Sequence, residues 1–202
     1  MKDICVWIIC VCAVVFGSCY VYKIWERKAI PTTSTWIIFL VGCGMSLTTY
    51  IIAENGDWKS GIMNTVDVAY VAAILVAILL WTENKVRFRP FEKWYLVGAG
   101  LILVYGVATG NAWNLNILTQ VLMSSAYLPM FHKLLVEKKK TDSYFAWIPP
   151  AFTAALALYP AIYEGNALAV LYAARALFFT LVTVFLMFYY QLKSKRTAST
   201  TQ

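Results

Sequence analysis

Long apolar stretches separated by short polar segments make up most of this chain. A helix that crosses the hydrocarbon layer of a membrane needs roughly 20 mainly apolar residues. Seven stretches reach or approach that length, at residues 4–21, 35–53, 61–82, 94–108, 113–131, 143–163 and 167–190. The pattern therefore predicts an all-α, polytopic membrane protein with seven transmembrane helices.

The fourth and fifth of these stretches are separated by an argument from length. The chain between Lys93 and Lys133 contains no Asp, Glu, Lys or Arg. As one helix it would reach about 58 Å at the usual rise per residue, nearly twice the ~30 Å thickness of the hydrocarbon layer. The turn-forming sequence Thr109-Gly110-Asn111 lies near its middle and predicts a break between two spans.

Positive charge is concentrated in the polar segments between the spans. Fourteen of the 17 Lys and Arg residues lie in four segments, at 23–28, 85–93, 133–140 and 193–196. Seven spans put all four segments on one side of the membrane and leave Lys2 and Lys59 on the other. Such an excess is typical of cytoplasmic loops. We therefore expect the N-terminus outside, the C-terminus in the cytoplasm, and the protein in the plasma (inner) membrane.

The composition agrees with a lipid-facing protein. Apolar residues make up 61% of the chain and charged residues 13%, whereas soluble domains are about half apolar and about a quarter charged. The net charge of +7 is explained by the basic loops, which can contact anionic lipid headgroups. The bilayer and a small-molecule solute are the expected partners, and nucleic acid is not. A homo-oligomer is left open.

Several function classes lack the residues that they require. The seventh stretch has no lysine for a retinal Schiff base, and no P-loop phosphate-binding sequence occurs. The chain has one histidine, and its five cysteines lie in apolar stretches without metal-ligand spacing. We expect neither an enzyme nor a cofactor or metal site.

A weak internal repeat relates the two halves of the chain. Tyr20 and Tyr127 are each followed by a basic loop and then by a tryptophan, Trp36 or Trp147, and the loop of the second half is slightly longer. Residues 1–82 and 110–192 are thus predicted to form two parallel three-helix bundles. Residues 83–109 supply a cytoplasmic loop and a linker helix, and residues 193–202 a flexible tail.

Seven helices in a 3+1+3 order make the chain resemble the SWEET/PQ-loop superfamily of membrane transporters. The segment that carries the resemblance is 127–131, with the basic loop after it and Trp147. The Pro-Gln pair of that family is absent, since Met130 follows Pro129, so the chain would be a divergent member. The resemblance implies alternating access between two repeats, with Pro129, Pro149 and Pro150 as hinges in the second half only.

Asp67 and Arg175 are the only formal charges within the predicted spans. A charge near the bilayer centre costs at least ~2.5–3.5 kcal/mol, so each is expected to face a partner or a cavity. Both lie at a similar depth from the outer side, because their spans run in the same direction. The residues alone leave two alternatives open: a structural salt bridge, or a site for a solute or a proton.

The repeat aligns Asn64 with Arg175, at the same offset that aligns Trp36 with Trp147. In SWEET-like proteins an asparagine on each of these two helices contacts the substrate, so the resemblance implies substrate binding at Asn64. Arg175 departs from that pattern, and a guanidinium favours an anionic or carboxylate-bearing solute. Tyr70 and Tyr172 lie three residues from Asp67 and Arg175, on compatible helix faces.

The fifth stretch carries Asn116, Gln120 and Ser124 at helical spacing, which predicts a polar stripe on one face. Such a stripe can line a pathway or join helices, and both options stay open. The resulting hypothesis is a transporter of a small polar solute, with an anionic group favoured, that binds at Asn64, Asp67, Arg175, Tyr70, Tyr172, Asn116 and Gln120. The alternative is a non-transporting seven-helix receptor or sensor.

Overall fold

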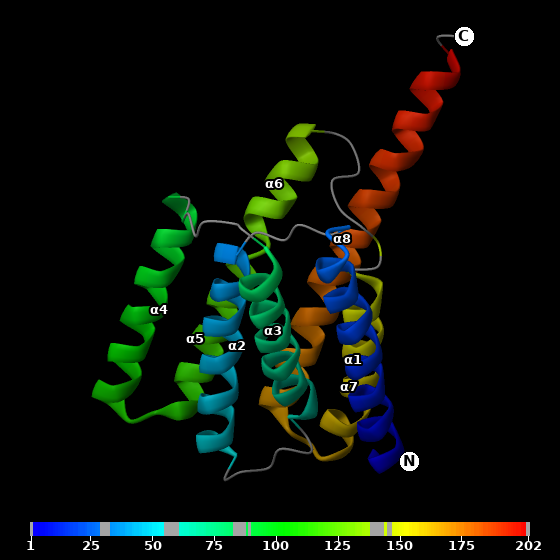
Figure 1. Cartoon of the computed structure of the whole chain (residues 1–202). Coiled ribbons are helices and arrows are strands. Elements are labelled where there is room, and N and C mark those ends of the chain that lie inside the picture. Colours follow the sequence, from blue (N-terminus) through cyan, green and yellow to red (C-terminus); the bar gives the residue numbers. More distant parts are fainter. Residues whose placement is uncertain are drawn as a thin grey trace.

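The computed structural model describes residues 2–28, 33–54, 61–82, 88, 90–137, 144 and 147–200. Every regular element in these ranges is a helix (Figure 1). In chain order the helices are α1 (Lys2–Trp25), α2 (Thr33–Ala53), α3 (Ile62–Trp81), α4 (Pro90–Thr109), α5 (Ala112–Ser125), α6 (Leu128–Glu137), α7 (Ile148–Tyr163) and α8 (Ala167–Thr200).

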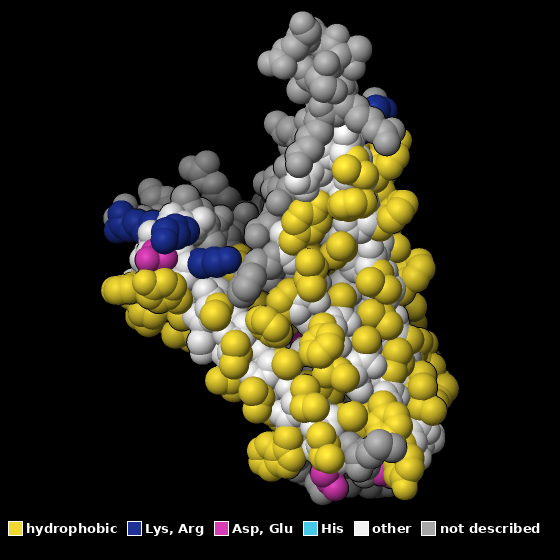
Figure 2. All heavy atoms as spheres, turned by 90° about the vertical axis from the view of Figure 1, so that its right-hand side faces the viewer, with side chains coloured by type: hydrophobic (Ala, Val, Ile, Leu, Met, Phe, Trp, Pro, Cys, Tyr) yellow, Lys and Arg dark blue, Asp and Glu magenta, His cyan; other side chains and the backbone are white. Residues whose placement is uncertain are grey.

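Five of the described helices, α1 to α4 and α8, are long and apolar enough to cross a membrane. The helix α7 is apolar but shorter. Apolar side chains cover a broad band of the surface, and Lys and Arg side chains lie near one end of it (Figure 2). The helical elements and the five long apolar helices confirm the prediction of an all-α chain suited to a membrane. We call the end that holds Lys28, Lys193 and α6 the basic end, and the other the N-terminal end.

The fourth helix differs from its predicted bounds, and the turn after it is confirmed. The prediction began at residue 94, but α4 begins at Pro90, because proline suits the first turn of a helix. Glu92 is buried and accepts a hydrogen bond from Ser34 Oγ at 2.9 Å. Gly110 ends the helix with a φ of 62°, and the side chain of Asn111 caps α5.

The fifth predicted span, 113–131, is not one helix, so that prediction is wrong in its continuity. The helix α5 ends at Ser125, and a turn at Ala126 and Tyr127 separates it from α6. Pro129 explains the break, because it has no N–H to donate to the carbonyl of Ser125. The same residue fits the first turn of α6, where that N–H would be unpaired in any helix.

The last two predicted spans also change their bounds. The helix α7 begins at Ile148 rather than at residue 143, and Pro149 and Pro150 lie in its first turn. All three prolines expected to act as hinges therefore lie at helix starts, whereas the proline inside a helix is Pro160. The helix α8 continues to Thr200, through most of the segment predicted to be a flexible tail.

The helices form one bundle (Figure 1). The helix α3 packs against α1 and α2, and α8 packs against α7 and α5. Across the halves, α1 packs against α7 and α2 against α5. The helix α4 lies at the edge, against α5 and α2. These contacts bring α2, α3, α5 and α8 together around one interior.

Aromatic side chains fill the interior toward the basic end. Tyr20 and Trp36 have ring centroids 5.8 Å apart, and their counterparts in the repeat, Tyr127 and Trp147, lie 6.0 Å apart. Phe39 contacts Tyr127 edge-on, with centroids 6.4 Å apart. Such rings contribute about 0.5–1.5 kcal/mol per pair beyond the area they bury. The aromatic cluster thus joins the two halves at this level.

Two glycines of α2 offer a matched test of this packing. A methyl group at Gly42 would approach the Tyr95 hydroxyl to 2.6 Å and Met123 Cγ to 3.1 Å, whereas one at Gly44 would meet nothing within 4 Å. We expect Gly42→Ala to lower the stability in detergent by about 1–3 kcal/mol. Gly44→Ala should be neutral or stabilising by up to about 1 kcal/mol. Equal thermal midpoints for the two variants would contradict the close packing of α2, α4 and α5.

Candidate functional site

A fully buried serine on α2 is the centre of a polar network inside the bundle. The Oγ of Ser46 accepts hydrogen bonds from Asn64 Nδ2 at 3.1 Å and from Gln120 Nε2 at 2.7 Å. The backbone carbonyl of Ser46 accepts a third bond from Asn116 Nδ2 at 2.9 Å. These bonds join α3 and α5 to α2.

The polar stripe of α5 contributes two of its three predicted members to this network. Asn116 and Gln120 are both buried, and Gln120 Nε2 donates to Asn116 Oδ1 at 3.2 Å. Asn116 Nδ2 also donates to Thr49 Oγ1 on α2 at 2.9 Å. Ser124 instead donates to the Gln120 carbonyl of its own helix at 2.8 Å. Asn116 and Gln120 on one face of α5 therefore join this helix to α2, whereas the hydroxyl of Ser124 takes no part in the network.

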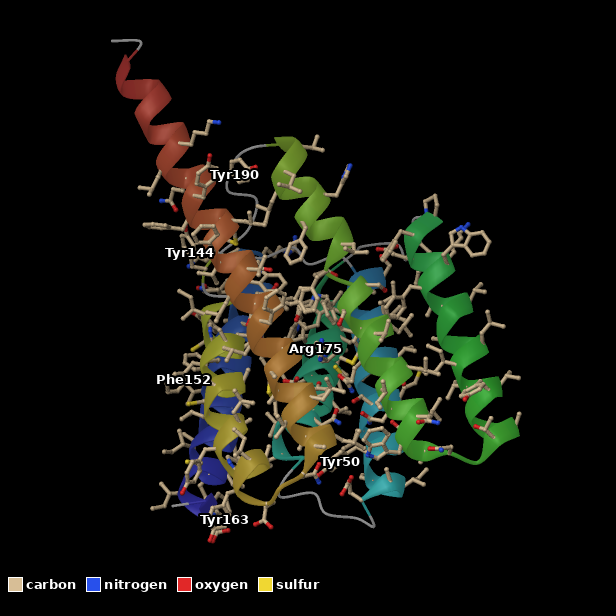
Figure 3. The ribbon with its side chains drawn as sticks, turned by 180° about the vertical axis from the view of Figure 1, so that it is seen from behind. Tyr50, Tyr144, Phe152, Tyr163, Arg175 and Tyr190 are labelled. Atoms are coloured by element: carbon tan, nitrogen blue, oxygen red, sulfur yellow. The ribbon has the colours of Figure 1, made fainter. Side chains whose placement is uncertain are left out.

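Arg175 enters the network from the first third of α8 (Figure 3). Its Nε donates to Gln120 Oε1 at 2.9 Å, and its Cζ lies 5.0 Å from the centre of the Tyr172 ring. The side chain is 9% exposed, and the Tyr127 hydroxyl also interacts with it. No carboxylate of the described residues lies within ion-pair distance of this guanidinium. An amide and an aromatic face position the cation without neutralising it.

Tyr172 separates Arg175 from Asp67, so the direct salt bridge considered from the sequence is not formed. The hydroxyl of Tyr172 donates to Asp67 Oδ2 at 2.8 Å and lies 3.7 Å from Cys43 Sγ. Tyr172 and Arg175 are three residues apart, hence on one face of α8. The ring of Tyr172 therefore meets the guanidinium while its hydroxyl meets the carboxylate.

Tyr70, the other tyrosine predicted at the site, lies outside the polar network. Its ring packs against Trp36, with centroids 6.2 Å apart, and against the surface of Gly17 on α1. It therefore belongs to the aromatic cluster toward the basic end. Six of the seven predicted site residues are joined directly or through one neighbour: Asn64, Asp67, Asn116, Gln120, Tyr172 and Arg175. The seventh, Tyr70, lies one helical turn from Asp67 along α3.

A narrow hollow without room for a water molecule lies beside the network toward the N-terminal end. Its lining consists of small or apolar residues and two network members, namely Gly61, Met63, Asn64, Ala157, Ala169, Tyr172 and Ala173. Asn64 is only 2% exposed, and its Oδ1 has no hydrogen-bond partner. Exchanging the amide oxygen and nitrogen would leave the nitrogen unpaired instead. An unsatisfied buried amide costs about 1–3 kcal/mol, and a ligand group can satisfy it.

The hollow is too narrow to seat a water molecule in this conformation, and a contact between helices lies on each side of the network. Toward the N-terminal end, Asn166 Nδ2 donates to the buried Tyr50 hydroxyl at 2.9 Å, which joins α2 to the start of α8. Toward the basic end, the contact of Phe39 with Tyr127 joins α2 to the end of α5. We refer to these two contacts as the closing contacts.

Sequence reasoning missed Ser46, Thr49 and Cys43, all of them on α2. Their pattern carries little signal, because hydroxyl side chains in helices commonly bond to their own backbone. Thr49 does so, donating to the Met45 carbonyl at 2.8 Å. Asn64 was predicted from the repeat and the family resemblance, and Asn116 and Gln120 from their spacing on one face of an apolar span.

Within the described ranges, no group of three His, Cys, Asp or Glu residues could hold a metal ion. In comparisons with protein-family models, with curated proteins and with solved structures, no match to this chain was found. Its function is therefore inferred from the polar network and from the hollow beside it.

Proposed function

We propose that this chain is a membrane transporter of a small polar solute with an anionic group, and a divergent relative of the SWEET/PQ-loop transporters. The observation that carries the proposal is Arg175, a buried guanidinium without a carboxylate partner among the described residues. An isolated charge in a low-dielectric interior is costly. A bound carboxylate or similar anion would compensate that charge, and a guanidinium can bind it through two parallel hydrogen bonds.

The packing of the helices supports two parallel repeats joined by α4. A two-fold axis along the bundle would exchange α1 with α5, α2 with α7 and α3 with α8, and the observed contacts of α1 with α7 and of α2 with α5 obey this exchange. The pairs Tyr20–Trp36 and Tyr127–Trp147 obey it too. In this view α1 to α4, α5 with α6, α7 and α8 are seven spans in a 3+1+3 order. A central site between parallel repeats is a recurring transporter plan.

The network residues then divide into contacts with the solute and supports. Arg175 anchors the anionic group, and the unpaired amide atom of Asn64 supplies a hydrogen bond at the hollow. Gln120 fixes the orientation of the guanidinium through its Nε, and Asn116 in turn orients Gln120. Tyr172 lines the hollow and keeps the cation over its ring.

Alternating access would open one of the two closing contacts at a time. Breaking the Tyr50–Asn166 hydrogen bond would expose the network toward the N-terminal end. Separating Phe39 from Tyr127 would expose it toward the basic end. The turns before α6 and α7, with Pro129, Pro149 and Pro150, are suited to absorb the motion, since the helical hydrogen bonds are interrupted there.

The orientation proposed is N-terminal end outside and basic end in the cytoplasm, and cysteine labelling tests it. Glu164 and Lys193 are exposed at opposite ends of the described structure. In a background without the five native cysteines, Glu164→Cys should react with an impermeant maleimide added to whole cells. Lys193→Cys should react only after the cells are opened. Labelling of Lys193→Cys in intact cells would reverse the orientation.

The transport proposal is tested first by binding and then by uptake. Purified protein is heated with a panel of monocarboxylates, sulfonates, amino acids and neutral sugars, and the anions are expected to raise the thermal midpoint. The best ligand is then supplied in labelled form to proteoliposomes. Saturable uptake supports a transporter, and stabilisation without uptake supports a receptor or sensor of the same fold. A panel in which only neutral sugars stabilise the protein would contradict the anion site.

A further inference from the structure

Asp67 is the sixth residue of α3, and binding of an anion at Arg175 does not use it. It is half-buried and lies in the chain between Val66 and Val68, which pack against an apolar cluster of the bundle. The Tyr172 hydroxyl donates to its Oδ2, and no cation is paired with it among the described residues. Neither Asp67 nor Arg175 lines the hollow, and the two side chains are joined through Tyr172.

The formal charges of the interior determine what that role can be. With Asp67 ionised and Arg175 protonated, the interior carries one negative and one positive charge, joined through Tyr172. A monoanion bound at Arg175 would leave a net negative charge in a low-dielectric region, which is unfavourable. One proton on Asp67 restores a net charge of zero.

We propose, on the basis of the function proposed above, that Asp67 binds one proton whenever a monoanion binds at Arg175, so that the two cross the membrane together. The proton adds to a carboxylate oxygen of Asp67 from water on the side that is open, and no bond of the solute is formed or broken. On the other side the anion leaves, and the same proton returns to water. Each transport step is therefore electroneutral.

The other ionisable and charged groups near Asp67 do not replace it in this role. The groups that pack around it on each neighbouring element are Cys43 on α2, Tyr172 and Arg175 on α8, Tyr70 on α3, Tyr127 after α5, and Cys10 on α1. The helix α7 contributes alanines to this cluster, and its two tyrosines are exposed. Thiols, phenols and a guanidinium keep one protonation state near neutral pH, so Asp67 alone can take up a proton there.

Methanesulfonate is a suitable probe, because this small monoanion is never protonated in water. Any pH dependence of its binding therefore belongs to the protein. Binding to purified protein is measured by calorimetry from about pH 8 to about pH 5, in buffers of different ionisation enthalpy, which yields the number of protons taken up. In the wild type, each fall of one pH unit should tighten binding by about tenfold until Asp67 is fully protonated. Close to one proton should be taken up per anion.

Asp67→Asn mimics the protonated carboxyl and should bind methanesulfonate independently of pH, as tightly as the wild type does at low pH. Glu164→Gln, which removes an exposed carboxylate at the N-terminal end, is the matched control and should behave as the wild type. Binding by the wild type that does not depend on pH would overturn the proposal. Proton uptake that persists in Asp67→Asn would overturn it as well.

Two further measurements keep the proton site testable by itself. Tyr172→Phe keeps the carboxyl group of Asp67 but removes the hydroxyl that donates to its ionised form, so the pH dependence of methanesulfonate binding should shift to higher pH.

If methanesulfonate binds at no pH, the anion site of the proposed function fails, and infrared spectroscopy decides whether Asp67 takes up a proton. A protonated-carboxyl band that titrates in the wild type and is missing in Asp67→Asn supports the proton site, and the absence of such a band overturns it.

Discussion

Arg175→Gln is expected to abolish uptake of the anionic solute while the protein still folds. The guanidinium is the one cation that the described structure buries within the bundle, and its Nε donates to the neutral amide of Gln120. Truncating one partner of a buried charged hydrogen bond costs about 2–5 kcal/mol, so affinity should fall at least about 30-fold. The measurement is uptake by proteoliposomes over a range of solute concentrations.

Arg175→Lys separates the effect of charge from that of geometry. Lysine keeps the positive charge but lacks the planar fork that binds a carboxylate through two bonds. It should therefore retain binding at an affinity between those of the wild type and Arg175→Gln. An Arg175→Gln protein with a normal thermal midpoint and unchanged uptake would show that Arg175 is not the anchor. The anion proposal would then lose its main support.

Gln120→Met is expected to cause the largest loss of stability among single changes in the polar network. The amide of Gln120 accepts from Arg175 Nε at 2.9 Å and donates to Ser46 Oγ and Asn116 Oδ1. Methionine has a similar volume but leaves these buried groups short of a partner, at about 1–3 kcal/mol for each. Ser46 Oγ keeps its bond from Asn64, so two groups lose their partner, and we expect a total loss of about 2–6 kcal/mol. A thermal scan in detergent measures it as a lower midpoint.

The neighbouring residue on α5 provides the control for this change. Thr119 is also buried, but its hydroxyl bonds only to the Leu115 carbonyl of its own helix at 2.9 Å. Thr119→Val should therefore cost at most about 1 kcal/mol. A combined Arg175→Met and Gln120→Met variant should lose less than the sum of its single changes, because the two side chains are partners. Equal losses for Gln120→Met and Thr119→Val would contradict a central role for Gln120.

Hydropathy predicted a helix boundary well where the residues at that boundary determine it by themselves. The turn at Gly110 follows from a residue that adopts a positive φ without strain. The predicted fourth helix began only after Lys93, the last charge of its basic segment. The helix α4 instead begins at Pro90 and includes Glu92, which is buried against Ser34, a residue distant in sequence. Pro129 was recognised, but its effect was assigned to a hinge rather than to a complete break of the helix. A local pattern shows that a proline is present, whereas the packing around it decides how far the helix is interrupted.

The sequence by itself determined that the chain is helical, that its surface suits a membrane, and that Asp67, Arg175 and the amides of α5 are polar residues in apolar spans. Hydropathy and helical period are local, so they carry this information without any knowledge of neighbours. Only the tertiary structure decided that Ser46 links three helices and that Tyr172 lies between Asp67 and Arg175. Those contacts join residues far apart in the chain, and their geometry depends on how α2, α5 and α8 pack around one interior.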